Sequence, residues 1–141
     1  MKELLVYIIL AYRKLISEIE YNTYLDQLFL NNPENDVLLY LEWETDIKRA
    51  FDYVSNHINY NISNLDCFGK LLMNHLKVIY ENCTDIKWFA NQMYDLWKSL
   101  PKDIQYSVPF CNLCYADDPL SWNDEHQVRV NYEVLFHYYD N

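Results

Sequence analysis

The chain of 141 residues contains a single glycine, Gly69. Tight β-hairpins favour Asn-Gly or Asp-Gly, and neither dipeptide occurs. Phosphate-binding loops and nucleophile elbows also need glycines, and Gly69 stands alone in Asp66-Cys67-Phe68-Gly69-Lys70. The sequence therefore predicts a mainly α fold and argues against dinucleotide- and nucleoside-triphosphate-binding enzymes. Because glycine is so scarce, we expect asparagine to supply the left-handed residues that end helices. The candidates are Asn31, Asn32, Asn59, Asn61 and Asn82.

Apolar residues at helical spacing predict helices over residues 2–20, 21–30, 36–57, 64–82 and 85–100. Residues 37–43 could alternatively be extended. Ser63 or Asn64 would cap the fourth helix and Thr84 the fifth. We expect one domain over residues 1–141, a helical bundle of four to six helices.

The C-terminal third shows a different pattern. Apolar residues alternate with other residues over 104–110 and again over 128–138, which is the period of a strand. We favour strands there, which would add a short C-terminal β-hairpin. A helix is the alternative for 128–139, and it would leave Val130 and Val134 exposed. Residues 111–125 would form a long connection, a feature that often marks a binding loop.

The negative charge is concentrated in two segments. Residues 15–47 contain eight carboxylates and no basic side chain, and residues 103–141 contain seven carboxylates and only Arg129. The net charge is −10. Such a surface repels nucleic acids and anionic lipid and attracts cationic proteins. We therefore expect a basic protein as partner, with no direct nucleic-acid binding and no membrane binding.

The sequence predicts a cytoplasmic protein. No run of about 18 apolar residues is present that could span a membrane. The apolar residues 4–11 follow Glu3, precede Arg13 and Lys14, and lack a small-residue cleavage site, so we expect no signal peptide. In the cytoplasm the four cysteines would stay reduced.

Two types of chemistry have weak support. Cys111-Asn112-Leu113-Cys114 has C-x-x-C spacing, but a second half of the usual zinc motif is missing. Further ligands would have to come from Cys67, Cys83, His126 or His137. No motif selects a nucleophile, base and acid, and His75 falls on an apolar helix face. We expect no metal, no cofactor and no enzymatic activity.

The first acidic segment contains an aromatic residue between carboxylates, Glu42-Trp43-Glu44-Thr45-Asp46. In a helix, Glu44 could pair with Lys48; in an extended segment, Glu42, Glu44 and Asp46 would share one face. A solvated helix face is the alternative interpretation, and a core-facing Trp43 is another. An exposed Trp43 with a charged rim would suit a protein interface, which we favour, with Glu42, Glu44 and Asp46 as predicted partner-binding residues.

The second acidic segment is the stronger candidate. Asp118-Pro119 suits the start of a helical turn, which would account for one or two acids. Aromatic anchors and carboxylates together suit a basic groove on another protein. The predicted partner-binding residues here are Tyr115, Asp117, Asp118, Trp122, Asp124 and Glu125.

The small size, the acidic and Tyr- and Asn-rich composition, and the segments 42–46 and 117–125 resemble helical immunity proteins of bacterial toxin systems, especially those of contact-dependent growth inhibition. That resemblance implies a non-enzymatic cytoplasmic inhibitor that binds the C-terminal domain of its cognate toxin. Such toxins are commonly nucleases with a basic active site, which the inhibitor would cover. The alternative hypothesis is an acidic nucleic-acid mimic, an anti-restriction or anti-repressor protein.

Overall fold

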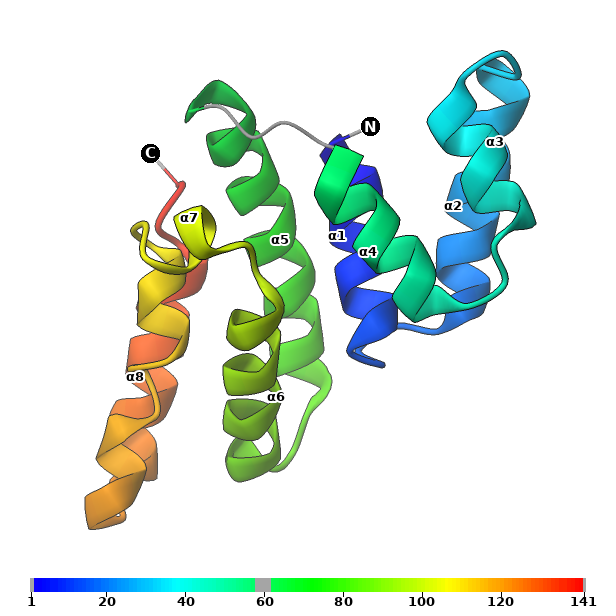
Figure 1. Cartoon of the computed structure of the whole chain (residues 1–141). Helices are drawn as coiled ribbons and strands as arrows, with labels where there is room; N and C mark the ends of the chain where they lie inside the picture. Colours follow the sequence, from blue (N-terminus) through cyan, green and yellow to red (C-terminus); the bar gives the residue numbers. More distant parts are fainter. Residues whose placement is uncertain (1, 58–61, 141) are drawn as a thin grey trace. The chain divides into compact units, whose positions relative to one another are not determined.

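The computed structural model describes residues 2–57 and 62–140, and most of these residues lie in helices (Figure 1). No β-strand occurs among them, so the mainly α prediction is confirmed. The described residues form eight α-helices and two 3-10 helices, more than the four to six helices predicted. The chain divides into two compact units, residues 1–64 (unit 1) and 65–141 (unit 2). The single domain over 1–141 stays a prediction.

Unit 1 contains α1 (Lys2–Tyr12), α2 (Glu18–Asn31), α3 (Asp36–Trp43) and α4 (Ile47–His57). Helix α1 packs against α2 and α4, α2 against α3, and α3 against α4. Stacked rings reinforce two of these contacts: Tyr7 lies 4.4 Å from Tyr24, and Tyr12 lies 4.8 Å from Phe51, between ring centroids. The apolar residues of α1 are buried almost completely, which is how a helix without a polar face is stabilised.

The first predicted helix, 2–20, ends earlier than predicted. Helix α1 ends at Tyr12, and Lys14 adopts a left-handed conformation with φ of 61°. Helix α2 begins at Glu18, where the side chain of Ser17 accepts a hydrogen bond of 3.2 Å from the backbone N–H of Glu20. A serine cap supplies a partner for one of the free N–H groups of a helix start, so it favours a break that apolar periodicity does not reveal.

The predicted helix 36–57 is two helices, and the extended alternative for 37–43 is wrong because these residues lie in α3. The Asn35 side chain accepts hydrogen bonds from the N–H groups of Val37 and Leu38 and so caps α3. Residues 44–46 are not helical. The Asp46 side chain accepts hydrogen bonds from the N–H groups of Lys48 and Arg49 and so caps α4. This second cap divides one apolar pattern into two helices.

Unit 2 contains most of α5 (Ile62–Asn82), followed by α6 (Ile86–Ser99), α7 (Lys102–Gln105), η1 (Phe110–Leu113), η2 (Asp118–Trp122) and α8 (Glu125–Phe136). Its core includes an aromatic cluster in which Phe89 packs edge-on against Tyr132, with ring centroids 4.9 Å apart. Tyr80 and Phe136 complete the cluster. Helices α5, α6 and α8 thus share one aromatic core.

The prediction of strands in the C-terminal third is wrong. Residues 125–136 form α8, and 102–105 form α7, so there is no hairpin in this described part of the chain. The helical alternative buries Val128, Tyr132, Leu135 and Phe136 on one face and leaves Val134 68% exposed. Because that face meets the aromatic cluster, helical packing outweighs the alternating pattern.

The predicted helix ends also differ in detail. Asp85, not Thr84, caps α6 by accepting hydrogen bonds from two backbone N–H groups. Helix α5 begins at Ile62, so the predicted caps at 63 and 64 lie inside it. Asn32 has φ of −141°, and among the described residues only Lys14 and Asn123 are left-handed, so the left-handed asparagine ends predicted at 31, 32 and 82 are wrong. Positions 59 and 61 lie outside the described residues.

Candidate functional site

Residues 110–122, which we call the 3-10 segment, have nearly continuous three-residue periodicity. Most of its backbone N–H groups bond to the carbonyl three residues earlier, for example Tyr115 to Asn112 and Asp118 to Tyr115. Side chains three residues apart align on one face of such a helix. The aligned residues Phe110, Leu113, Ala116 and Pro119 are all buried. The predicted long connection is therefore an ordered element with one apolar side.

The 3-10 segment holds both predicted aromatic anchors in solvent. Tyr115 is 62% exposed and Trp122 is 63% exposed. Tyr115 lies off the buried 110, 113, 116, 119 row, which accounts for its exposure. Trp122 is the next position of that row, but it is exposed at the end of the segment. Asp118 and Glu125 are exposed as well. We call Tyr115, Asp117, Asp118, Trp122 and Glu125 the acidic aromatic face.

Two of the predicted acids, Asp124 and Asp117, interact with the fold itself. Asp124 caps α8, because its carboxylate accepts a 3.0 Å hydrogen bond from the backbone N–H of Gln127. Asp117 is partly buried, and this burial raises the pKa of its carboxyl group, as does the charge of Asp118.

The charge of Asp117 also acts on a buried tyrosine of α8, Tyr132. The hydroxyl of Tyr132 has no hydrogen-bond partner among the described residues, and burial and the charge of Asp117 raise its pKa.

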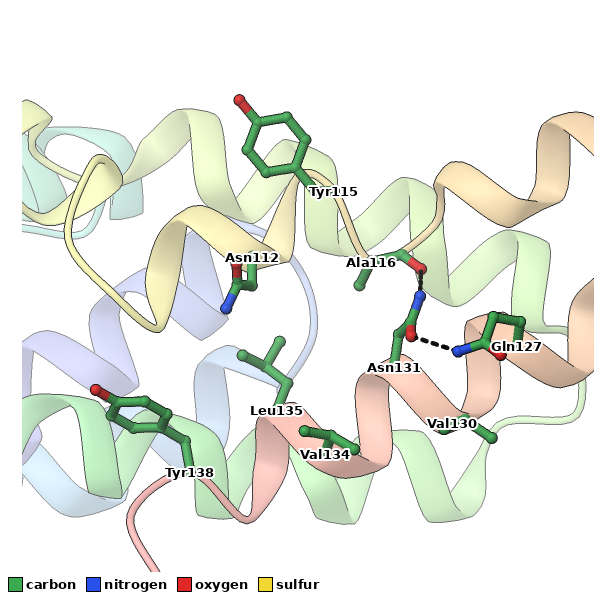
Figure 2. Close-up of a pocket in the computed structure, with 9 residues that line it drawn as sticks. All are labelled: Asn112, Tyr115, Ala116, Gln127, Val130, Asn131, Val134, Leu135 and Tyr138. Atoms are coloured by element: carbon green, nitrogen blue, oxygen red, sulfur yellow. Dashed lines mark hydrogen bonds between the residues drawn. The ribbon is translucent and has the colours of Figure 1, made fainter.

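A groove of about 420 Å³ lies between the 3-10 segment and α8 (Figure 2). In its wall, Asn131 donates a 3.1 Å hydrogen bond to the carbonyl of Ala116 and accepts one of 2.9 Å from Gln127. Tyr115, Val134 and the half-exposed Tyr138 offer apolar surface. The remaining lining residues are Asn112, Val130 and Leu135. The sequence did not predict this groove, although the helical alternative placed Val134 and Val130 at the surface, where Val134 is exposed and Val130 is partly buried.

The first acidic segment lies in unit 1. Trp43 is 81% exposed at the end of α3. Glu44 accepts hydrogen bonds from the Tyr40 hydroxyl and from the backbone N–H of Asp46. Asp46 in turn accepts hydrogen bonds at 2.9 and 3.2 Å from the first backbone N–H groups of α4. Both carboxylates therefore stabilise the turn between α3 and α4, which the sequence analysis did not predict.

Glu42 has different surroundings. It is partly buried beside a hollow of about 310 Å³ within unit 1 and is hydrogen-bonded to the side chain of Asp26 on α2. Burial raises the pKa of Glu42, and the hydrogen bond and charge of Asp26 raise it further. Asp26 was not among the predicted site residues. Sixteen positions separate it from Glu42, so only the packing of α2 on α3 brings them together.

The C-x-x-C pair lies at the start of the 3-10 segment. The Cys114 thiol donates a 3.1 Å hydrogen bond to the carbonyl of Cys111, and burial raises the pKa of this thiol. All four cysteines are free. In the described part of the chain, no three His, Cys, Asp or Glu side chains are grouped so that they could hold a metal ion.

No protein-family model, curated protein or solved structure matches this chain. Within residues 2–57 and 62–140, no helix has the length and apolar character needed to cross a membrane.

Proposed function

We propose that this chain is an immunity-type inhibitor that binds a basic toxin domain and covers its active site. The acidic aromatic face of unit 2 would be the main contact, with the apolar groove beside α8 receiving a side chain of the toxin. Trp43 in unit 1 would add a second contact. The inhibitor would act by occlusion and would itself catalyse no reaction.

The exposure of Tyr115 and Trp122 is the observation that carries this proposal. Each residue is more than 60% exposed, although the segment that bears them buries Phe110, Leu113, Ala116 and Pro119. The fold therefore holds two large aromatic side chains in solvent on an ordered element. Such rings dominate binding energy in protein interfaces, because they bury much area and lose little conformational freedom.

The carboxylates around these rings support a cationic partner. Asp118 and Glu125 are exposed beside the aromatic residues, and residues 103–141 carry only one basic side chain. Carboxylates of this kind accept bidentate hydrogen bonds from arginine and speed encounter with a positively charged surface. In a nuclease groove they would occupy the positions of substrate phosphates. A basic nuclease domain is therefore the toxin class that we propose.

The direct test is protection. We expect bacteria that express the cognate toxin domain to grow only when this chain is co-expressed. With purified proteins, Trp122→Ala should weaken binding by about 30-fold or more, the effect of losing an interface anchor worth about 2 kcal/mol. Asp118→Lys combined with Glu125→Lys should slow association about tenfold or more at low salt. Stopped-flow fluorescence and calorimetry measure these quantities.

Asp52→Lys is the matched control, because it reverses an exposed charge on α4 in unit 1. It should change association much less than the unit 2 reversals. The rate for the wild-type chain should fall steeply between about 0.05 and 0.5 M salt as screening shortens the range of the charges. A salt-independent association rate, or full protection by the Trp122→Ala and Tyr115→Ala double variant, would contradict the proposal.

A further inference from the structure

Unit 1 contains a second hollow that the proposed contact face does not use. It has a volume of about 310 Å³ and lies between α2, the end of α3 and the turn into α4. Its acidic lining residues come from both sides of the hollow: Glu18 and Asp26 from α2, and Glu42 and Glu44 from the end of α3. The other lining residues are Tyr21, Asn22, Leu25, Leu41, Thr45 and Ile47.

Two of these carboxyl groups are held against each other. Glu42 and Asp26 both line the hollow, and partial burial, the side-chain hydrogen bond and the charge of Asp26 raise the pKa of Glu42. Two neighbouring carboxylates repel each other, and a cation bound between them would relieve that repulsion.

A buried tyrosine gives independent evidence for a ligand. Tyr21 lines the hollow and is only 3% exposed, and its hydroxyl has no hydrogen-bond partner among the described residues. Burial raises the pKa of Tyr21, and so does the charge of Glu42, which places the phenol within reach of that carboxylate's field. A buried hydroxyl without a partner is costly, and buried polar groups are normally hydrogen-bonded. A donor group in the hollow would supply the missing bond.

We propose that this hollow binds the guanidinium group of an arginine side chain. Arginine presents five N–H donors in a planar fork, which suits acceptors on several sides of one hollow better than the compact ammonium of lysine does. The carboxylates of Asp26 and Glu42 would accept charge-assisted hydrogen bonds. The phenol oxygen of Tyr21 would accept a further one, and Leu25 and Leu41 offer apolar surface to the methylene groups.

The arginine would belong to the basic partner, and this part of the inference rests on the proposed function. Unit 1 would then add a specific pocket to the binding supplied by the acidic aromatic face of unit 2. Glu42, predicted from the sequence as a partner-binding residue, would be a pocket residue, whereas Glu44 and Asp46 chiefly stabilise the turn.

The pocket can be tested without any partner. The full chain is titrated with N-acetyl-arginine amide and followed by NMR, with N-acetyl-citrulline amide as the neutral analogue of the same shape. We expect saturable shifts around Tyr21 and Glu42 with the arginine compound alone. Glu42→Gln should weaken binding about tenfold, the effect of losing one charge-assisted hydrogen bond, and Tyr21→Phe should weaken it less.

Glu34→Gln is the control, because it removes an exposed carboxylate of unit 1 that does not line the hollow. Equal shifts with arginine and citrulline, shifts spread over all exposed acids, or equal weakening by Glu34→Gln would overturn the pocket. Tyr21→Phe keeps the ring and Glu42→Gln keeps a hydrogen-bonding partner for Asp26, so both variants should fold.

The assignment to a partner has a separate readout. When a protein partner has been identified, Glu42→Gln should weaken the binding of the chain to this partner, and Glu34→Gln should not. Unchanged partner affinity in Glu42→Gln would overturn the assignment, even if the arginine compound binds. If no basic protein binds the chain, the proposed function fails, while the titration with the arginine compound still decides the pocket.

Discussion

The only glycine, Gly69, offers a sharp test of how unit 2 is packed. It lies inside α5 with ordinary helical backbone, where alanine would normally stabilise the helix by about 1 kcal/mol. A methyl group at this position, however, would meet the hydroxyl of Tyr139, with the ring Cζ of Tyr139 at 2.6 Å and the Cζ of Phe110 at 2.8 Å. Both ring distances are far below ordinary van der Waals contact.

The two neighbours differ in their freedom to move. Tyr139 is partly exposed near the end of the chain, whereas Phe110 is fully buried and lies against Phe68, with ring centroids 5.9 Å apart. Overpacking of this kind typically costs about 1–3 kcal/mol. With the gain in helix propensity subtracted, we expect Gly69→Ala to lower the free energy of unfolding by up to about 2 kcal/mol.

Urea denaturation followed by circular dichroism measures this change. Asn74→Ala, at an exposed site on the same helix, is the control and should raise stability by a few tenths of a kcal/mol. Adding Tyr139→Ala to Gly69→Ala should relieve part of the clash, so the double variant should be less destabilised than the sum of the singles. If Gly69→Ala is as stabilising as Asn74→Ala, then Tyr139 and Phe110 do not lie on α5 as described.

Two further predictions concern carboxylates. Because the pKa of Glu42 is raised above its ordinary 4.5, the folded state binds more protons than the unfolded state in the pH range above 4.5, and stability falls as the pH rises through that range. Glu42→Gln should therefore unfold at a higher temperature than the wild-type chain at pH 7, with a difference that disappears below pH 4.5; an equal difference at both pH values would refute this. Asp124→Ala should cost about 1 kcal/mol in urea denaturation through loss of the α8 cap, and no cost would mean that the cap is not formed.

The helical character of this chain could be read from the sequence, but its helix boundaries could not. Apolar periodicity continues across the breaks at Lys14 and at 44–46, because the residues on both sides are buried. Side-chain caps decide such breaks, and Ser17 and Asp46 are too common as residue types to mark a helix start without knowledge of the structure.

The apolar alternation over residues 128–138 predicted a strand wrongly for a different reason. Residues 128–138 satisfy both a two-residue and a helical period, and the sequence alone cannot weigh the partners that each would meet. The cap at Asp124 and the aromatic surface offered by Phe89 decide in favour of the helix. Tertiary packing here overrides a local pattern.

The candidate site was predicted in part. The acidic aromatic residues of 115–125 were singled out from composition, and both rings are exposed as an interface would require. The groove beside α8 and the pairing of Asp26 with Glu42 depend on contacts between separate helices, which one sequence does not encode in a readable pattern. The three-residue spacing of Phe110, Leu113, Ala116 and Pro119 was readable but was not recognised.

With the exception of Trp122, the three-residue spacing separates the residues that maintain the fold from those that would contact a partner. The buried row of Phe110, Leu113, Ala116 and Pro119 holds the segment in place. Tyr115 and Asp118 lie off this row and face solvent, and Trp122 is exposed at the end of the row. Substitution of these exposed residues should leave the core undisturbed. Under the proposed function, the chain would change its partner by surface substitution alone. Related chains would then share the inward residues and differ in the outward ones, so their specificity could evolve while their scaffold stayed constant.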